Sequence, residues 1–244
     1  MQTAALQLAM DVVDRCEGAT SALAAGRALR DALHPLGAYG FYAGAYPVHA
    51  GADEHQIAAH HHLYAQFSPP GWQDAYRTEG LDAGNPVILA AGRTATPFRW
   101  SASGVRGTEN WKGIDVARAI GMADGFAVPC HGPGGYVAIV SIGFRSFDLS
   151  PREQTAIHLA AVAVHDRMRA LSPPPAPRAL PVKLSPRERD CLGFVAMGLT
   201  DWDISVRLGI SQTTARAHVE NAKRKLGART RPEAVARLAA AGLL

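Results

Sequence analysis

The chain has 244 residues, of which 48% are hydrophobic and 19% are charged, so it has room for one ordinary domain and one small one and is globular rather than disordered. It contains no apolar run as long as a membrane-spanning helix, and residues 1–10 lack the pattern of a secretion signal. Its three cysteines are far apart and odd in number, which argues against a disulfide framework or a Cys-x-x-Cys zinc site and predicts a cytoplasmic protein.

The net charge of +4 is concentrated in one part of the chain. Residues 183–244 hold eleven Lys and Arg against six Asp and Glu, whereas residues 1–182 hold fourteen against fifteen. A small basic module joined to a near-neutral domain indicates a polyanionic partner. Charge alone leaves two interpretations open, a nucleic-acid-binding surface and a solvated basic surface.

The chain begins with two predicted helices. Residues 3–16 and 20–34 are rich in Ala, Leu and Arg, and Pro35 ends the second helix. Residues 39–49 are aromatic-rich and predict a strand, whereas residues 69–79 begin with prolines that suit the first turn of a helix.

The next elements complete an α+β domain. A helix is predicted within residues 107–120, and strands over 126–129 and 136–144 are separated by a Gly-rich turn, which predicts a β-hairpin. Ser150 and Glu153 have the spacing of a capping box that opens a long helix. Helices that flank an antiparallel sheet predict an α-β-α sandwich.

The long helix carries an apolar stripe along one face. This stripe could pack on the sheet or on a second subunit, and periodicity does not distinguish the two. Its members are Ile157, Ala160, Ala161, Val164, Met168 and Leu171.

A proline-rich segment marks the domain boundary. Five prolines fall within the ten residues from Ser172 to Pro181, which excludes a helix and predicts an extended, semi-rigid spacer. We therefore predict a large α+β domain over residues 1–171, a linker over 172–182 and a small helical domain over 183–244.

The helices of the C-terminal part have clear boundaries. Ser185 and Glu188 form a second capping box, and the helix that follows ends at Gly198. Thr200 caps a short helix, and Gly209 lies at the turn after it.

Two further helices complete an all-α four-helix domain. Ser211 caps a helix over residues 212–226, and a last helix runs over 231–241. Two helices joined by a short turn that contains Gly form a helix-turn-helix, whose second helix can enter the major groove of DNA.

The third of these helices has an apolar face and a polar face. The inward positions are Ala215, Val219, Ala222 and Leu226. On the polar face, Arg can contact guanine, Gln and Asn can contact adenine, and hydroxyls can contact phosphate. The candidate DNA-binding residues are Gln212, Thr213, Arg216, Asn221 and Arg224. Any small four-helix domain shows such stripes, but the caps, the Gly positions and the basic third helix together favour DNA binding.

Residues 184–244 resemble the LuxR-type helix-turn-helix almost end to end. Ala215 and Ala222 depart from that pattern, where the family usually has Val and Ile. The resemblance implies a transcription regulator that binds an operator in double-stranded DNA as a homodimer. The matching positions are Leu184, Glu188, Leu192, Gly198, Ile204, Leu208, Gly209, Ser211, Thr214, His218, Lys225, Leu226 and Arg231.

The domain that precedes this module could in principle be a phosphorylated receiver. A receiver would alternate strands and helices and would carry an acidic pair and a late lysine. Residues 1–171 hold a single lysine, Lys112, and show no such alternation. We therefore discount a receiver domain.

The large domain carries Trp72 and Tyr76 four residues apart, followed by Asn85, Trp100 and Gly125. With this spacing, about residues 20–170 instead resemble the acyl-homoserine-lactone-binding domain of quorum-sensing regulators, in which the glycine comes slightly later. The resemblance implies a small diffusible signal as ligand and no other cofactor. A plainer interpretation is that the aromatic residues belong to an ordinary core.

The resemblance assigns a role to each of these side chains. The indole N–H of Trp72 would donate to a lactone carbonyl, and the hydroxyl of Tyr76 to the acyl carbonyl. Trp100 would stack on the head group, and Ser141 would add a hydroxyl. Trp72 and Tyr76 are one helical turn apart and so point the same way.

Asn85 departs from the family pattern, which has an aspartate that accepts the amide N–H of the ligand. The loss of the charge-assisted bond costs on the order of 1 kcal/mol, or about fivefold in affinity. Asn also brings an NH2 group that needs an acceptor. We therefore expect a head group that differs from a plain acyl-homoserine lactone, or no ligand at all.

Two other motifs carry little functional information. His60, His61 and His62, with His55 nearby, point in different directions and lack an acidic or Cys partner, so we expect no metal site. Cys130 precedes a histidine but has no orienting acid, so we expect no catalytic residues and no enzyme.

These features together predict a cytoplasmic, ligand-responsive transcription regulator with no membrane association. One alternative is an orphan regulator of the same fold that has a non-lactone ligand or acts without one. Another is a sensor that acts through protein contacts.

Overall fold

The computed structural model of the chain divides into two compact units, one with the elements up to Pro174 and one with the four C-terminal helices. The structure describes residues 2–47, 61–79, 81, 85–104, 112–131, 136–175 and 183–240.

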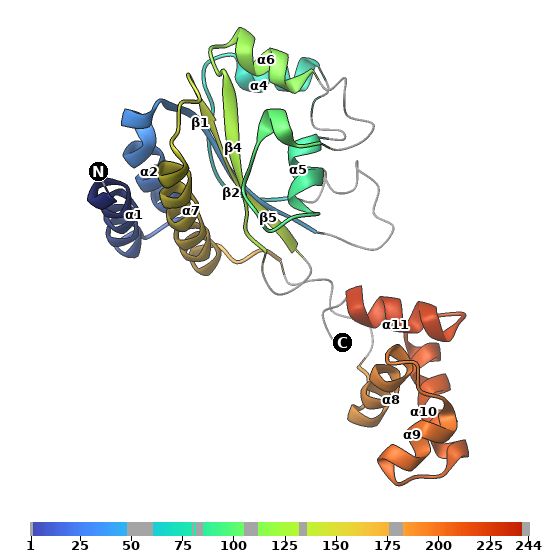
Figure 1. Cartoon of the computed structure of the whole chain (residues 1–244). Helices are drawn as coiled ribbons and strands as arrows, with labels where there is room; N and C mark the ends of the chain where they lie inside the picture. The colour runs from blue at the N-terminus through green and yellow to red at the C-terminus, as the bar shows by residue number, and fades with distance from the viewer. Residues whose placement is uncertain are drawn as a thin grey trace. The chain divides into compact units, whose positions relative to one another are not determined.

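An antiparallel sheet of five strands forms the centre of the first unit (Figure 1). The strand order is β2-β1-β5-β4-β3, and β1 and β5 form its long central pair, with Phe41 opposite Ile142. The predicted pairing of the strands over 126–129 and 136–144 is confirmed, because β4 runs antiparallel to β5. The strands are β1 (Ala38–Pro47), β2 (His62–Phe67), β3 (Phe98–Arg99), β4 (Asp124–Pro129) and β5 (Tyr136–Phe144).

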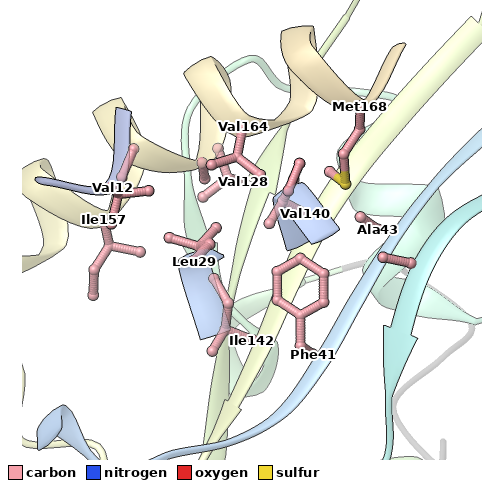
Figure 2. Packing of buried hydrophobic residues seen from close by; sticks show 14 of the residues in the cluster. Val12, Leu29, Phe41, Ala43, Val128, Val140, Ile142, Ile157, Val164 and Met168 are labelled. Atoms are coloured by element: carbon pink, nitrogen blue, oxygen red, sulfur yellow. The ribbon is translucent and has the colours of Figure 1, made fainter. Parts of the chain in front are cut away.

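Three long helices cover one face of this sheet (Figure 1). They are α1 (Gln2–Glu17), α2 (Ala22–Leu33) and α7 (Pro151–Leu171). Strand side chains alternate between the two faces, so Phe41 of β1 and Val140 and Ile142 of β5 belong to this layer. Figure 2 shows them near Ile157 and Val164 of α7. The predicted stripe of α7 therefore packs inside its own domain, where full burial of such a side chain contributes roughly 1.5–3 kcal/mol.

Shorter helices lie on the other face of the sheet. They are α4 (Trp72–Thr78), α5 (Pro86–Ala91) and α6 (Gly113–Ala119). Val87 and Ala91 of α5 pack with Ala127 of β4 and with Val137 and Ile139 of β5. The layers are thus helix, sheet and helix, which confirms the predicted α+β sandwich.

Three elements escape sequence-based prediction. The edge strand β2 begins inside the His-rich stretch, which masks its alternation. Helix α5 has six residues and strand β3 has two, so both are too short to show a period.

One predicted helix is shorter than expected, and another lies within its predicted range. The helix predicted over 69–79 begins at Trp72, because Gly71 adopts a left-handed φ of 80° directly before it. The helix predicted within 107–120 is α6, and residues 105–111 lie outside the described part of the chain. The same holds for linker residues 176–182.

Over residues 183–240, the second unit has four helices, as the sequence predicts. They are α8 (Pro186–Ala196), α9 (Asp201–Leu208), α10 (Gln212–Lys225) and α11 (Arg231–Ala240). Gly209 ends α9 with a left-handed φ of 63°, which the turn of a helix-turn-helix requires. The shared core consists of Leu184, Cys191, Leu192, Ile204, Ala215, Val219, Ala222, Leu226, Ala228, Ala234 and Leu238.

Side-chain caps fix where these helices begin. The predicted capping box of Ser185 and Glu188 is present, with the backbone N–H of Ser185 2.7 Å from the Glu188 carboxylate. Thr200 forms a further capping box, completed by Asp203. The hydroxyl of Ser211 accepts from the backbone N–H of Thr214 at 3.0 Å. Such caps each contribute about 1 kcal/mol.

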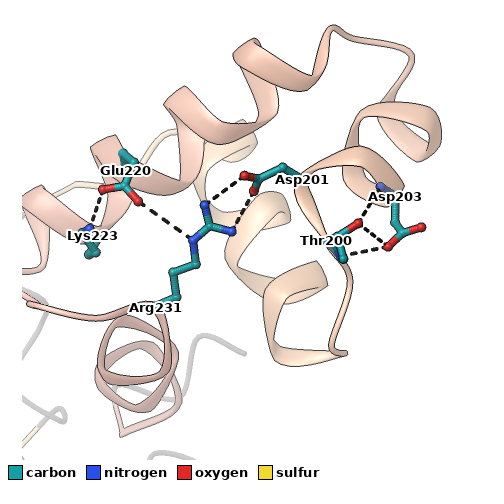
Figure 3. Close-up of polar contacts among 6 residues, drawn as sticks. All are labelled: Thr200, Asp201, Asp203, Glu220, Lys223 and Arg231. Atoms are coloured by element: carbon teal, nitrogen blue, oxygen red, sulfur yellow. Dashed lines mark hydrogen bonds and ion pairs between the residues drawn. The ribbon is translucent and has the colours of Figure 1, made fainter.

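Ion pairs join the helices of this unit, and Figure 3 shows those of Arg231 with Asp201 and Glu220. The guanidinium of Arg231 on α11 donates to both carboxylate oxygens of Asp201 on α9, at 2.8 and 3.0 Å. Lys225 of α10 donates to Glu188 of α8 at 2.7 Å. Burial raises the pKa of the Glu188 carboxyl, but the bonds from Lys225 and Ser185 outweigh it and hold the pKa below its usual value.

Every helix in the described part of the chain is too short or too polar to cross a lipid bilayer.

His165 makes the stability of the first unit depend on pH. It is 2% exposed on α7, beside the Tyr64 ring, and burial lowers its pKa to about 4, although Asp166 opposes the shift. The unfolded chain therefore binds an extra proton between pH 4 and 6.5, so the free energy of unfolding falls as pH drops through that window, by roughly 3 kcal/mol in total.

Urea denaturation at several pH values tests this expectation. His165→Leu should remove most of the slope between pH 6.5 and 4. His158→Gln, a change at a partly exposed position of the same helix, serves as the matched control and should retain it. An unchanged slope in His165→Leu would contradict the assignment.

Candidate functional site

A cavity of about 370 Å³ lies between the sheet and helices α4 and α5 of the first unit. Side chains from β1 and β5 form its floor, and aromatic residues dominate its wall. The structure brings together the five candidate ligand residues, which all line this cavity: Trp72, Tyr76, Asn85, Trp100 and Ser141.

Helix α4 supplies two of these side chains. Its start is set by the prolines and by Gly71, so Trp72 is the first helical residue and Tyr76 lies one turn later. Their ring centroids are 5.3 Å apart. The two aromatic rings therefore form one continuous part of the wall, as the four-residue spacing predicts.

Trp100 lies flat against the sheet because two strand residues have no side chain. A Cβ added to Gly125 of β4 would collide with the Trp100 indole, and one added to Gly143 of β5 would collide with Met122 and approach the indole. The indole N–H of Trp100 donates to Oγ of Ser141 at 2.8 Å. Trp100 and Ser141 thus form one hydrogen-bonded unit of the wall.

Asn85 is held by two hydrogen bonds. It is the N-cap of α5, where Oδ1 accepts from the backbone N–H of Val87 at 2.9 Å. Its Nδ2 donates to the hydroxyl of Tyr76 at 2.7 Å. Asn85 therefore connects the start of α5 with α4 through the cavity wall.

Two tyrosines of β1 line the cavity although they are not among the sequence-based candidates. The hydroxyl of Tyr46 donates to that of Tyr42 at 2.6 Å. Burial raises the pKa of both phenols, so both remain protonated. Their four-residue separation places them on the same face of the predicted strand. The sequence would have identified them as cavity residues if it had shown which face of the strand lies toward the cavity.

The described histidines of the His-rich stretch and Cys130 take part in packing and hydrogen bonding within the domain. His61 stacks on Tyr46 with centroids 5.7 Å apart, and Nε2 of His62 donates to the carbonyl of Ser172 at 2.9 Å. No group of three or more His, Cys, Asp or Glu in the described residues is placed to bind a metal, and His55 and His60 lie outside them. Burial raises the pKa of the Cys130 thiol to about 12, which prevents it from acting as a thiolate.

Helix α10 of the second unit separates into two faces. Ala215, Val219 and Ala222 are buried, as predicted. Four of the five candidate DNA-binding side chains are exposed, and Asn221 is half-buried, with its Oδ1 accepting from Arg224 at 2.9 Å. The exposed four are Gln212, Thr213, Arg216 and Arg224.

The cations of α10 divide into two groups. Lys223 pairs with Glu220, and Lys225 pairs with Glu188 across the core. Arg216 forms no ion pair with any residue that the structure describes, and Arg224 contacts Asn221. Lys225 therefore joins α10 to α8 and Lys223 pairs within α10, whereas the exposed Arg216 and Arg224 can meet an external polyanion.

A cavity-bearing α+β domain and a helix-turn-helix domain together define a ligand-responsive transcription regulator. Comparison with known families agrees with this class. Residues 25–168 match the autoinducer binding domain, and residues 182–238 match the bacterial regulatory proteins of the luxR family. The chain belongs to the LuxR family of quorum-sensing transcription regulators, which are DNA-binding proteins and not enzymes.

Individual relatives support the same assignment. The transcriptional activator protein BjaR1 of Bradyrhizobium diazoefficiens is 36% identical over 178 residues, or 71% of this chain and 72% of that protein. The quorum sensing-dependent regulator RpaR of Rhodopseudomonas palustris is 36% identical over 72% of each chain. The crystal structure of Escherichia coli SdiA has a TM-score of 0.61 at 18% identity, covers 97% of this chain and 98% of that one, and shows the same fold.

The glycine under Trp100 gives a test of the cavity wall. Gly125→Ala should lower the free energy of unfolding by roughly 1–3 kcal/mol, because the added methyl group displaces a packed indole. Urea denaturation followed by tryptophan fluorescence measures the loss. Gly92→Ala is the matched control, since its Cβ would meet its nearest neighbour at 3.5 Å, an ordinary contact. Equal stability of the two variants would contradict the described wall.

Proposed function

We propose that this regulator binds a small acyl compound, an acyl-homoserine lactone or a related molecule, in the cavity between the sheet and helices α4 and α5. The observation that carries the proposal is the convergence of the five residues named by the family resemblance on one cavity of about 370 Å³. That volume lies within the range of roughly 300–1,000 Å³ that small-ligand sites occupy.

The cavity combines polar groups with an apolar lining. The indole N–H of Trp72 and the hydroxyls of Tyr76 and Ser141 serve the polar part of the ligand, and the ring of Trp100 stacks on its head group. Val87, Ile88, Phe67 and Met122 line the same cavity and suit an acyl chain.

Ligand binding acts through the stability of the first unit. A ligand that binds the folded domain stabilises it by mass action. Asn85 and Tyr76 connect α5 with α4. A ligand in the cavity that both helices line therefore adds contacts to both. The resulting shift toward the ligand-bound conformation controls how the DNA-binding domains of a dimer are positioned for the operator.

The second unit reads an operator with α10. The exposed N-terminal residues Gln212, Thr213 and Arg216 face base edges or phosphates, and Asn221 and Arg224 lie further along the helix. Base edges in the major groove give sequence specificity, whereas phosphate contacts set register. Activity on DNA, together with three buried, free thiols, fits a cytoplasmic protein.

The regulator acts as a homodimer on a palindromic operator. Two recognition helices must lie about one DNA turn apart to read two half-sites. Helix α7 offers an apolar surface for such a contact, because Leu159 is 52% and Val162 is 37% exposed on the side away from the core stripe.

Arg216 tests the DNA-binding role. Arg216→Ala should weaken binding to DNA selected by the wild-type protein from a random library by about tenfold or more, because a bidentate contact with guanine contributes roughly 1–3 kcal/mol. Fluorescence anisotropy across a salt series measures affinity, and the wild type should show a steep salt dependence. Arg189→Ala removes the same charge from an exposed position on α8. An equal loss in both variants would indicate a non-specific charge effect and contradict the role.

The exposed apolar residues of α7 test the dimer. A variant with Leu159→Glu and Val162→Glu should sediment as a monomer and bind the operator more weakly, since the charges would have to be buried in the interface. Leu23→Glu, at a leucine of α2 that is 46% exposed, is the matched control and should sediment as the wild type does. If the double variant still sediments as a dimer, the exposed face of α7 is not the dimer interface.

A further inference from the structure

The side chain of Asn85 has a defined orientation. The backbone N–H of Val87 can only donate, and it lies 2.9 Å from Oδ1 of Asn85. This bond assigns the oxygen of the amide to the first turn of α5 and the nitrogen to the other side. From there Nδ2 donates to the hydroxyl of Tyr76 at 2.7 Å.

The nitrogen of Asn85, rather than its oxygen, thus faces the wall that α4 contributes to the cavity. Nδ2 carries a second hydrogen, for which the described residues provide no partner. A carboxylate in this place would accept hydrogen bonds at both oxygens, whereas an amide nitrogen accepts none. The residue at this position therefore decides whether the wall requires a donor or an acceptor from the ligand.

The other described residues of the wall provide no carboxylate that could accept a hydrogen bond in place of an aspartate at position 85. The residues described as lining the cavity include no Asp or Glu. Trp72 contributes an indole N–H, which can only donate. The hydroxyl of Ser141 already accepts from Trp100, and Tyr42 accepts from Tyr46. A ligand N–H next to Asn85 would meet another N–H and lose the hydrogen bond that it makes with water.

We propose that the ligand places a hydrogen-bond acceptor, such as an ester or ketone oxygen, against Nδ2 of Asn85, and that an amide N–H is disfavoured at this point. The inference rests on the proposed function, in which this cavity binds the signal. It narrows the ligand to acyl compounds whose link to the head group is an ester or a carbon chain rather than an amide.

Two ligands that differ at one position test the proposal: N-hexanoyl-homoserine lactone and its ester analogue, α-hexanoyloxy-γ-butyrolactone. Calorimetry gives their dissociation constants for the full-length wild type and for Asn85→Asp. Asp caps a helix as well as Asn does, so the variant keeps the bond from Val87. We expect the wild type to bind the ester at least as tightly as the amide, and Asn85→Asp to favour the amide by about tenfold or more.

Gln73→Glu is the matched control, because it puts a carboxylate at another position of the same cavity wall. An equal shift toward the amide in this control would overturn the proposal, since the preference would then follow charge rather than the atom at Asn85. A wild type that favours the amide as strongly as Asn85→Asp does would also overturn it, and would leave the proposed function intact. Binding of neither ligand to any of the three proteins would overturn both.

Discussion

Burial of the sheet on both faces is the constraint on which the first unit depends. Side chains alternate along a strand. Val140 and Ile142 of β5 therefore pack against the long helices, whereas Ile139 and Ser141 line the cavity. The core on one side fixes the strands, and the strands in turn fix the cavity floor on the other. A polar residue such as Ser141 is accepted in this buried strand because the Trp100 indole donates to its hydroxyl.

In the second unit, side-chain caps and an ion pair at the ends of the helices add to the shared hydrophobic core. Each helix of the turn begins with a side-chain cap, and the buried carboxylate of Glu188 joins a cap to the end of α10 through Lys225. This arrangement uses cations of α10 for internal pairs and leaves Arg216 exposed. One cation of the helix therefore serves an internal ion pair between helices while another stays exposed at the surface, and the two can be altered separately.

Asn85 shows how one atom can redirect a site without disturbing the fold. As an N-cap it holds the start of α5, a task that Asn and Asp perform equally well. As part of the cavity wall it presents a nitrogen, where an aspartate would present an oxygen. The cap of α5 is thus compatible with either residue, whereas the hydrogen-bonding groups of the cavity wall differ between them.

The sequence by itself determined the class of the protein, its two domains and the helix caps at Ser150, Ser185 and Ser211, because capping and periodicity are local in the chain. It also named the five cavity residues, through a family resemblance. Only the tertiary structure decided that the stripe of α7 faces its own sheet, that Tyr42 and Tyr46 line the cavity and that Nδ2 of Asn85 turns toward Tyr76. These outcomes depend on the register between strands and on contacts between distant segments, which no local pattern in the sequence specifies.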